Sequence, residues 1–137
     1  MSFLLDVNVL VAWGWQDHVD HERTVHWIVT QKKSRGVDLV TSPIPEIGFV
    51  RVSVQRGLGR VTMSEAAAVL RSMLQSLGRR HRFLADDVSG TIWPEWCQRP
   101  GQTTNAHLAR LAAENGLKLA TLDAEIPKAF LLPLRQV

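Results

Sequence analysis

The sequence predicts an α/β fold: a single domain whose mainly parallel central sheet carries helices on both faces. The first observation is that three apolar segments stop on or shortly before a carboxylate, at Asp6, Glu46 and Asp123. The second is that stretches of helical periodicity separate these segments, as in βαβ units. The third is size, because 137 residues with 45% hydrophobic content match one domain with a buried core, covering residues 1–137.

The N-terminal part of the chain is expected to contain two strands and two helices. Residues 2–5 form a short buried strand, and residues 7–13 turn directly into a helix. Asp17 or Asp20 caps a second helix, because a short carboxylate accepts hydrogen bonds from the free N–H groups of a helix start. Residues 37–41 form the second strand.

A third helix is expected directly after that strand. Ser42 suits the N-cap and Pro43 the first helical position, and apolar residues continue at helical spacing to Val54. Glu46 then lies in the first turn, where the helix dipole favours a carboxylate by about 0.3 to 1 kcal/mol.

The C-terminal half repeats the alternation of helix and strand. Thr62 and Glu65 have the spacing of a capping box and begin an amphipathic helix. The elements expected after it are a strand at 81–85, a helix capped by Thr103 or Thr104 and stopped at Asn115-Gly116, and a strand at 117–122.

The net charge and the single cysteine indicate which kind of partner and which compartment to expect for the protein. The net charge is +3 with a sequence pI near 9.6, and most of the basic residues are arginine, which pairs well with phosphate, so an anionic partner suits the composition. The apolar stretch at 7–15 is shorter than the roughly 20 residues of a membrane span. Cys97 is the one cysteine and cannot form an internal disulfide, so we expect a cytoplasmic protein without membrane contact.

Four polar residues are expected at one edge of the sheet. Asp6 and Asp123 follow strands, and Glu46 and Asn105 lie in the first turns of helices; in a parallel sheet the carboxyl ends of the strands share the ligand-binding edge. Carboxylates about 4 Å apart repel by roughly 4 kcal/mol at an effective dielectric near 20, so a cation is needed between them. Oxygen ligands select Mg²⁺ or Mn²⁺, which indicates metal-assisted phosphodiester hydrolysis.

The residues around these positions form four motifs that together span nearly the whole chain. They are LLDVNVL at 4–10, SPIPEIGFVR at 42–51, TNAHLA at 104–109 and LATLD at 119–123. In order and spacing they resemble the landmarks of PIN-domain ribonucleases, specifically the VapC-type toxins of toxin–antitoxin modules. The resemblance implies a PIN-like domain, hydrolysis of RNA phosphodiester bonds, a homodimer, and a cognate VapB-type antitoxin that holds the enzyme inactive.

The resemblance also implies a role for each matching residue. Asp6 corresponds to the first acid, a direct metal ligand, and Asn8 to the polar residue that supports it through hydrogen bonds. Glu46 corresponds to the acid that orients a metal-bound water or acts as general base. Asp123 corresponds to the last acid, also a metal ligand, and Thr121 to the small hydroxyl residue that lines the site.

Asn105 departs from the family pattern, which has an aspartate at this position. Its amide oxygen can still bind a metal, but the site then holds three formal negative charges instead of four, which weakens divalent-ion affinity and above all the binding of a second ion. Three explanations stay open: a natural variant that uses one metal, a weakened or silent nuclease, or an engineered change that makes a toxic protein tolerable to express.

Candidate contacts to RNA or to an antitoxin flank these acids. Arg51 and Arg56 lie on the helix that begins near Glu46, and Trp93 and Trp96 lie in an expected loop. Arginine pairs with phosphate, and indole rings stack on unpaired bases or pack at protein surfaces. In the toxin family, basic residues near the site are also met by an antitoxin tail, so either partner could explain these residues.

Two other classes of protein stay open on the sequence. One is a PIN-like module that binds RNA or antitoxin without useful catalysis, because Asn105 silences the site. The other is a phosphotransfer receiver or a haloacid-dehalogenase-like phosphatase, which also carries acids at strand ends, although no suitable lysine follows a strand near the C-terminus.

Overall fold

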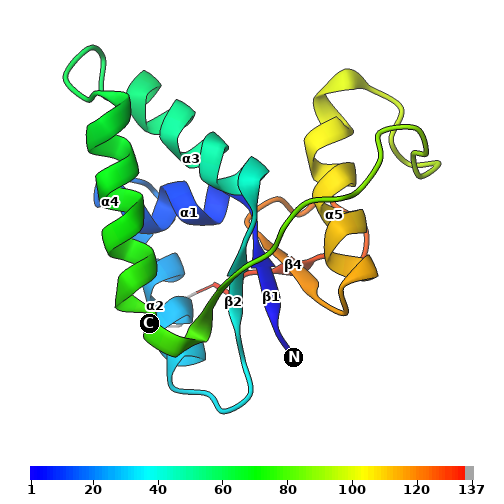
Figure 1. Cartoon of the computed structure of the whole chain (residues 1–137), viewed down its shortest axis with the longest axis horizontal. Coiled ribbons are helices and arrows are strands. Elements are labelled where there is room, and N and C mark those ends of the chain that lie inside the picture. Colours follow the sequence, from blue (N-terminus) through cyan, green and yellow to red (C-terminus); the bar gives the residue numbers. More distant parts are fainter. Residues whose placement is uncertain (135–137) are drawn as a thin grey trace.

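Five short strands form one sheet in which every neighbouring pair is parallel. The computed structural model describes residues 1–134, and within them the strand order is β3-β2-β1-β4-β5; Figure 1 labels the three central strands, β1, β2 and β4. The strands are β1 (Phe3–Leu5), β2 (Leu39–Thr41), β3 (His81–Phe83), β4 (Lys118–Thr121) and β5 (Phe130–Leu131). The predicted parallel sheet is confirmed, and its central strand is the one that leads to Asp6.

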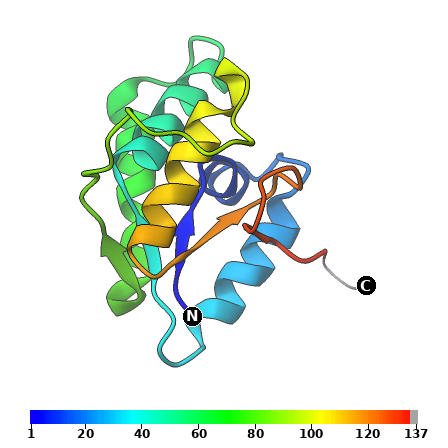
Figure 2. The same ribbon diagram turned by 90° about the vertical axis from the view of Figure 1, so that its right-hand side faces the viewer.

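Helices cover both faces of the sheet, as predicted. One group packs on one face, and α5 packs on the other (Figures 1 and 2). None of the helices within residues 1–134 has the length and apolarity needed to cross a membrane. The helices are α1 (Val7–Gly14), α2 (His21–Lys32), α3 (Pro43–Arg56), α4 (Met63–Ser76) and α5 (Thr103–Glu114), with short 3₁₀ turns at Gly78–Arg80 and Pro100–Gln102.

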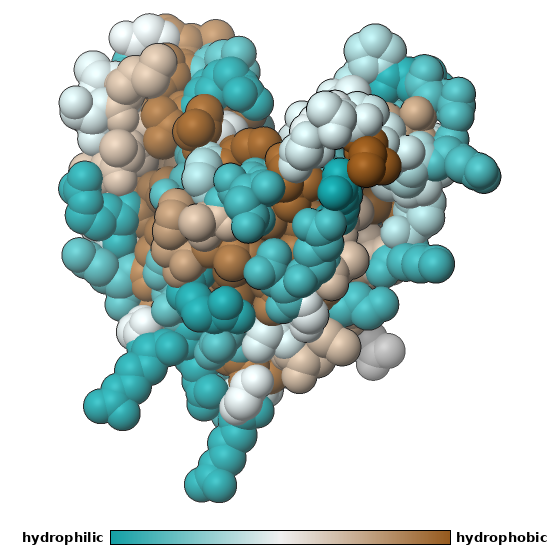
Figure 3. Space-filling view, turned by 45° about the vertical axis from the view of Figure 1, so that its right-hand side comes forward, coloured by the Kyte–Doolittle hydropathy of each residue, from teal (hydrophilic) through white to brown (hydrophobic). Residues whose placement is uncertain are grey.

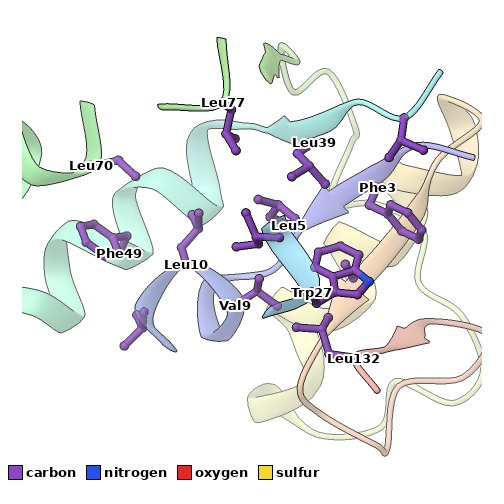
Figure 4. Packing of buried hydrophobic residues seen from close by; sticks show 14 residues of the cluster. Phe3, Leu5, Val9, Leu10, Trp27, Leu39, Phe49, Leu70, Leu77 and Leu132 are labelled. Atoms are coloured by element: carbon purple, nitrogen blue, oxygen red, sulfur yellow. The ribbon is translucent and has the colours of Figure 1, made fainter. Parts of the chain in front are cut away.

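Alternate residues of the central strand enter two separate hydrophobic clusters. Phe3 and Leu5 of β1 belong to one cluster together with Trp27 of α2 (Figure 4). Leu4, between them in sequence, belongs to the other cluster with Leu108 of α5. Successive side chains of a strand point to opposite faces, so β1 is apolar throughout because both faces of the sheet are covered.

Several predicted helix signals are confirmed. Thr62 Oγ1 accepts a hydrogen bond from the Glu65 N–H at 3.1 Å, and Glu65 Oε1 accepts one from the Thr62 N–H at 3.0 Å, which completes the capping box of α4. Pro43 begins α3 and Glu46 lies in its first turn. Gly116 follows the C-cap of α5 with φ of +68°, the left-handed conformation in which helices commonly end.

The start of α5 and the last strand differ from the prediction. Neither Thr103 nor Thr104 caps α5, because a 3₁₀ turn leads directly into the helix and places Gln102 at the N-cap position. Thr103 lies inside the helix, and its hydroxyl donates back to the Pro100 carbonyl at 2.7 Å. The prediction also misses β5, since two residues are too few to show a periodicity.

Two glycines bring α1 and α3 into close contact. A Cβ on Gly48 of α3 would lie 2.6 Å from Val7 Cγ2 of α1, and a Cβ on Gly14 of α1 would lie 2.7 Å from Phe49 Cε2 of α3. The helices approach this closely because the side chains are missing at these two points. Since α1 follows Asp6 and α3 carries Glu46, this contact also sets the relative position of two predicted acids.

We expect Gly48→Ala to destabilise the protein, although alanine is the better helix former by roughly 1 kcal/mol. The added methyl group must displace Val7, and overpacking of this kind costs about 1–3 kcal/mol. The free energy of unfolding, measured by urea titration, reports the change. Val7→Ala removes the opposing methyl groups, so the double variant should be more stable than Gly48→Ala alone. If the second substitution only adds to the loss, the contact is not its cause.

Candidate active site

The carboxyl ends of β1, β2 and β4 meet at one edge of the sheet, near the starts of α3 and α5 (Figure 1). At the same end of the molecule the surface is notched between two lobes, and hydrophobic residues lie inside the notch (Figure 3). Asp6 follows β1 and Asp123 lies just after β4. Glu46 and Asn105 lie in the first turns of α3 and α5, so all four predicted residues belong to this edge.

Asp6 is a buried carboxylate at the end of the central strand. Its Oδ1 accepts a hydrogen bond from the Val7 N–H at 2.7 Å and so caps α1, and its Oδ2 accepts one from the Thr121 hydroxyl at 2.8 Å. Burial, with 3% of the residue exposed, raises the pKa of Asp6 above its ordinary value; the two hydrogen bonds oppose this shift and the charge of Asp123 adds to it. A cation bound here would favour the ionised form.

The Thr121 hydroxyl joins the end of β4 to α1. Besides donating to Asp6, its oxygen accepts hydrogen bonds from Asn8 Nδ2 at 3.2 Å and from the Asp123 N–H at 3.0 Å. Asn8 Oδ1 in turn accepts one from the Leu122 N–H at 3.1 Å. The structure therefore places both predicted supporting residues, Asn8 and Thr121, in direct contact with the turn that carries Asp123.

Asn105 lies beside Asp123. Its Nδ2 donates a hydrogen bond to Asp123 Oδ2 at 3.2 Å, while Asp123 Oδ1 accepts one from the Glu125 N–H at 2.9 Å. Both side chains are half-buried. Three of the four predicted residues, Asp6, Asp123 and Asn105, are thus connected through Thr121 and one another.

Glu46 belongs to a second group of side chains. Its Oε2 accepts a hydrogen bond from the Thr41 hydroxyl at 2.7 Å, and the same hydroxyl lies 2.7 Å from His81 Nε2. Burial lowers the pKa of His81 below its ordinary value, and the nearby charge of Glu46 opposes this shift. The edge therefore carries two hydrogen-bonded groups, one around Asp6 and one around Glu46.

The donors of the first group suit a hard cation. No three His, Cys, Asp or Glu side chains within residues 1–134 are arranged to hold a metal ion by themselves, so Asn105 would have to complete the set formed by Asp6 and Asp123. Its amide nitrogen faces Asp123, and its oxygen becomes a ligand once the amide turns over. Two carboxylates and one amide oxygen match the ligands of Mg²⁺, which keeps several waters.

Comparisons with known proteins agree with this architecture. Ribonuclease VapC39 from Mycobacterium tuberculosis is 36% identical over 130 residues, which cover 92% of this chain and 91% of that protein. Ribonuclease VapC38 from the same organism is 39% identical over 127 residues, covering 90% and 86%. The chain belongs to the VapC ribonuclease family. The resemblance found in the motifs is confirmed, and the phosphotransfer and phosphatase alternatives are set aside.

A solved structure shares the fold of this VapC family member at low sequence identity. The crystal structure of VapBC2 from Rickettsia felis bound to a DNA fragment from their promoter matches with a TM-score of 0.56 and 14% identity. The match covers 96% of this chain and 97% of that chain. No protein-family profile matches the sequence.

Of the two predicted arginine contacts, Arg51 lies near a candidate acid and Arg56 does not. Arg51 is exposed and lines a groove of about 670 Å³ that also contains Glu46 and is formed by α3 and α4. Arg56, at the end of α3, instead pairs with Asp17 at 3.1 Å and stacks 5.0 Å from the centre of the Trp15 ring. Of these two arginines, Arg51 is the one that shares a groove with a candidate acid.

The two predicted aromatic residues lie in the loop before α5. Trp93 and Trp96 line a pocket of about 480 Å³ together with residues of α5 and β4. Trp93 is 42% exposed, and its Nε1 donates to the Gly90 carbonyl at 2.9 Å. Trp96 is half-buried against the cluster that contains Leu4, so it covers the edge of the core.

The sequence does not predict that two residues, Thr41 and His81, belong to the site. The sequence places Thr41 at the end of a strand, but its hydroxyl is assigned a role only by the contact with Glu46. His81 reaches Thr41 because β3 pairs with β2, with His81 opposite Leu39. No local pattern specifies which strand lies beside β2, so this contact could not be found from spacing.

We expect Asp6→Asn to change how stability depends on pH when EDTA removes divalent ions. Because folding raises the pKa of Asp6 above 3.8, the folded protein binds this proton more tightly than the unfolded chain does. This stabilisation is complete below the pKa of the unfolded chain and is lost as the pH rises through the pKa of the folded protein. The melting temperature of the wild type should therefore fall relative to that of Asp6→Asn as the pH rises above about 4.

The substitution also alters the hydrogen bond to Thr121. That change shifts the melting temperature at every pH, whereas the titration of Asp6 changes the slope. A difference between the two proteins that stays constant over this pH range would contradict the raised pKa.

Proposed function

We propose that the chain is a metal-dependent endoribonuclease toxin that hydrolyses RNA phosphodiester bonds and is neutralised by a cognate VapB-type antitoxin. The relatives carry the name ribonuclease VapC. The observation that carries the proposal within the molecule is the buried Asp6, which the Thr121 hydroxyl joins to the backbone of Asp123. Like charges held at the end of parallel strands are a site for a cation and for a phosphate that the cation attracts.

The metal of this proposal is Mg²⁺ or Mn²⁺, held by Asp6, Asp123 and, once its amide has turned over, Asn105. When bound, the ion polarises a phosphate oxygen and lowers the pKa of a bound water. Val7 and Thr121 orient the Asp6 carboxylate through hydrogen bonds. Glu46, half-buried in the groove and hydrogen-bonded by Thr41, is the candidate general base that takes a proton from the attacking water.

RNA and antitoxin are the proposed partners. Arg51 places a guanidinium in the groove that contains Glu46, where it can pair with a phosphate of RNA or a carboxylate of an antitoxin. The net charge of +3 suits either partner. A homodimer in the cytoplasm is proposed with them, and the single Cys97 is compatible with a reducing compartment.

Asn105 supports a second candidate, a VapC-like module that binds RNA or antitoxin without useful catalysis. Its amide donates to Asp123 and so uses, in the metal-free protein, an oxygen that would otherwise bind the cation. The two candidates share the same fold and surface, and they differ only in turnover.

We expect the purified protein, free of antitoxin, to cleave total RNA when Mg²⁺ or Mn²⁺ is added. Asp6→Ala should reduce cleavage by at least about 100-fold, since even residues that only support metal ligands contribute about 10–100-fold. Gel electrophoresis of the RNA measures the product. Cleavage that persists in Asp6→Ala is contamination, and if neither metal produces cleavage that depends on Asp6, the binding module is the correct function.

We expect Asn105→Asp to raise Mg²⁺-dependent cleavage and to lower the Mg²⁺ concentration needed for half-maximal rate. A further negative charge beside Asp123 attracts a cation, and a net gain of about 1–2 kcal/mol corresponds to roughly a 5- to 30-fold change in affinity. Asn115→Asp adds the same charge at the other end of α5 and serves as the control. Equal activity of Asn105→Asp and wild type across a Mg²⁺ titration would contradict this role for position 105.

A further inference from the structure

A chain of two hydrogen bonds leads from Glu46 through Thr41 to an outer strand of the sheet. The Thr41 hydroxyl lies 2.7 Å from Glu46 Oε2 and 2.7 Å from His81 Nε2. Thr41 is fully buried at the end of β2, and His81 begins the neighbouring strand β3. A half-buried carboxylate at the sheet edge is therefore connected to a histidine on an outer strand of the sheet.

Thr41 has one hydroxyl proton for its two hydrogen bonds, and this decides which atom donates in each of them. An ionised carboxylate only accepts, so the one hydroxyl proton of Thr41 must point to Glu46. The Thr41 oxygen then accepts from His81, and Nε2 of His81 must carry a hydrogen. If the Thr41 hydroxyl instead donated to His81 Nε2, the oxygens of Thr41 and Glu46 would lie 2.7 Å apart without a proton between them, unless Glu46 were protonated.

We propose that Thr41 and His81 are positioning residues of the ribonuclease site, because their hydrogen-bond chain orients Glu46 for its work as general base. The inference rests on the function proposed above. Each donor in such a chain strengthens the next one, so Thr41 donates more strongly to Glu46 when His81 donates to Thr41. A carboxylate held in one orientation is what a general base needs to reach the proton that it takes.

The surface around these residues is continuous. Arg71 and Leu74 of α4 line the groove that contains Glu46, and they also line a neighbouring hollow of about 490 Å³ that contains His81. The histidine that supports Glu46 thus lies beside the surface on which the proposed RNA would bind. In this position it acts through Thr41 rather than by touching the reacting atoms.

The test compares substitutions that remove or keep each hydrogen bond. Thr41→Val keeps the shape of the side chain and removes the hydroxyl, whereas Thr41→Ser keeps the hydroxyl. His81→Leu removes the ring donor, whereas His81→Gln keeps an N–H without a titrating ring. The substrate is the RNA fragment that wild type cleaves in total RNA, prepared by transcription and assayed with Mg²⁺.

We expect Thr41→Val and His81→Leu to lower kcat by about 10- to 100-fold, as misplacement of a catalytic group does, with KM for the RNA within about 2-fold of wild type. Thr41→Ser and His81→Gln should recover most of kcat. Equal kcat values for Thr41→Val and Thr41→Ser would overturn the proposal, and so would a rise in KM with kcat unchanged.

Thr24→Val is the matched control, because it removes the hydroxyl of a different buried threonine. Thr24 of α2 is also fully buried, and its Oγ1 has no hydrogen-bond partner among residues 1–134. The same substitution should therefore leave kcat unchanged. The melting temperature of every variant is measured, so that a loss of folded protein is separated from a loss of turnover.

A second measurement distinguishes failure of this inference from failure of the proposed function. NMR of protein labelled with ¹⁵N in its histidine rings should show His81 with its hydrogen on Nε2 in wild type and Thr41→Ser, and a mixture of tautomers in Thr41→Val. If wild type shows this pattern but cleaves no RNA, the hydrogen-bond chain is present and the ribonuclease function is wrong. If His81 carries its hydrogen on Nδ1, the inference is wrong whatever the activity.

Discussion

The structure of the site depends on the burial of one negative charge. Asp6 is 3% exposed, and an isolated carboxylate in such a place is costly unless donors surround it. The Val7 N–H and the Thr121 hydroxyl are those donors. Because Thr121 also accepts from Asn8 and from the backbone of Asp123, the groups that stabilise the buried charge are the same groups that hold the second acid beside it.

The other half of the site depends on helix packing instead. Gly48 and Gly14 let α1 and α3 approach until side chains of each touch the backbone of the other, and this places the first turn of α3 next to the start of α1. Glu46 is then oriented by Thr41 and His81 rather than by the network around Asp6. The two halves share the sheet edge but use separate hydrogen bonds, so a change in one can leave the geometry of the other intact.

The sequence predicts the parts of this arrangement that local patterns determine. Apolar strands that stop at Asp6 and Asp123, the proline that begins α3 and the capping box of Thr62 all act over a few residues, and parallel topology then brings the strand ends together. The contact of His81 with Thr41 depends on which strand pairs with β2, and spacing contains no such information. The caps expected at Thr103 and Thr104 fail for a related reason, because the preceding turn at Pro100–Gln102 decides where α5 begins.

The neutral side chain of Asn105 makes the folded site less dependent on a bound cation than an aspartate at the same position would. An aspartate at this position would face Asp123 as a second anion, and carboxylates about 4 Å apart repel by roughly 4 kcal/mol at an effective dielectric near 20, so the folded site would need a cation. The amide instead donates to Asp123 at 3.2 Å and turns that repulsion into an attraction. The metal-free site then lacks the repulsion that an aspartate at position 105 would add, and a cation that binds must first displace this hydrogen bond, which links the affinity for the ion directly to the identity of residue 105.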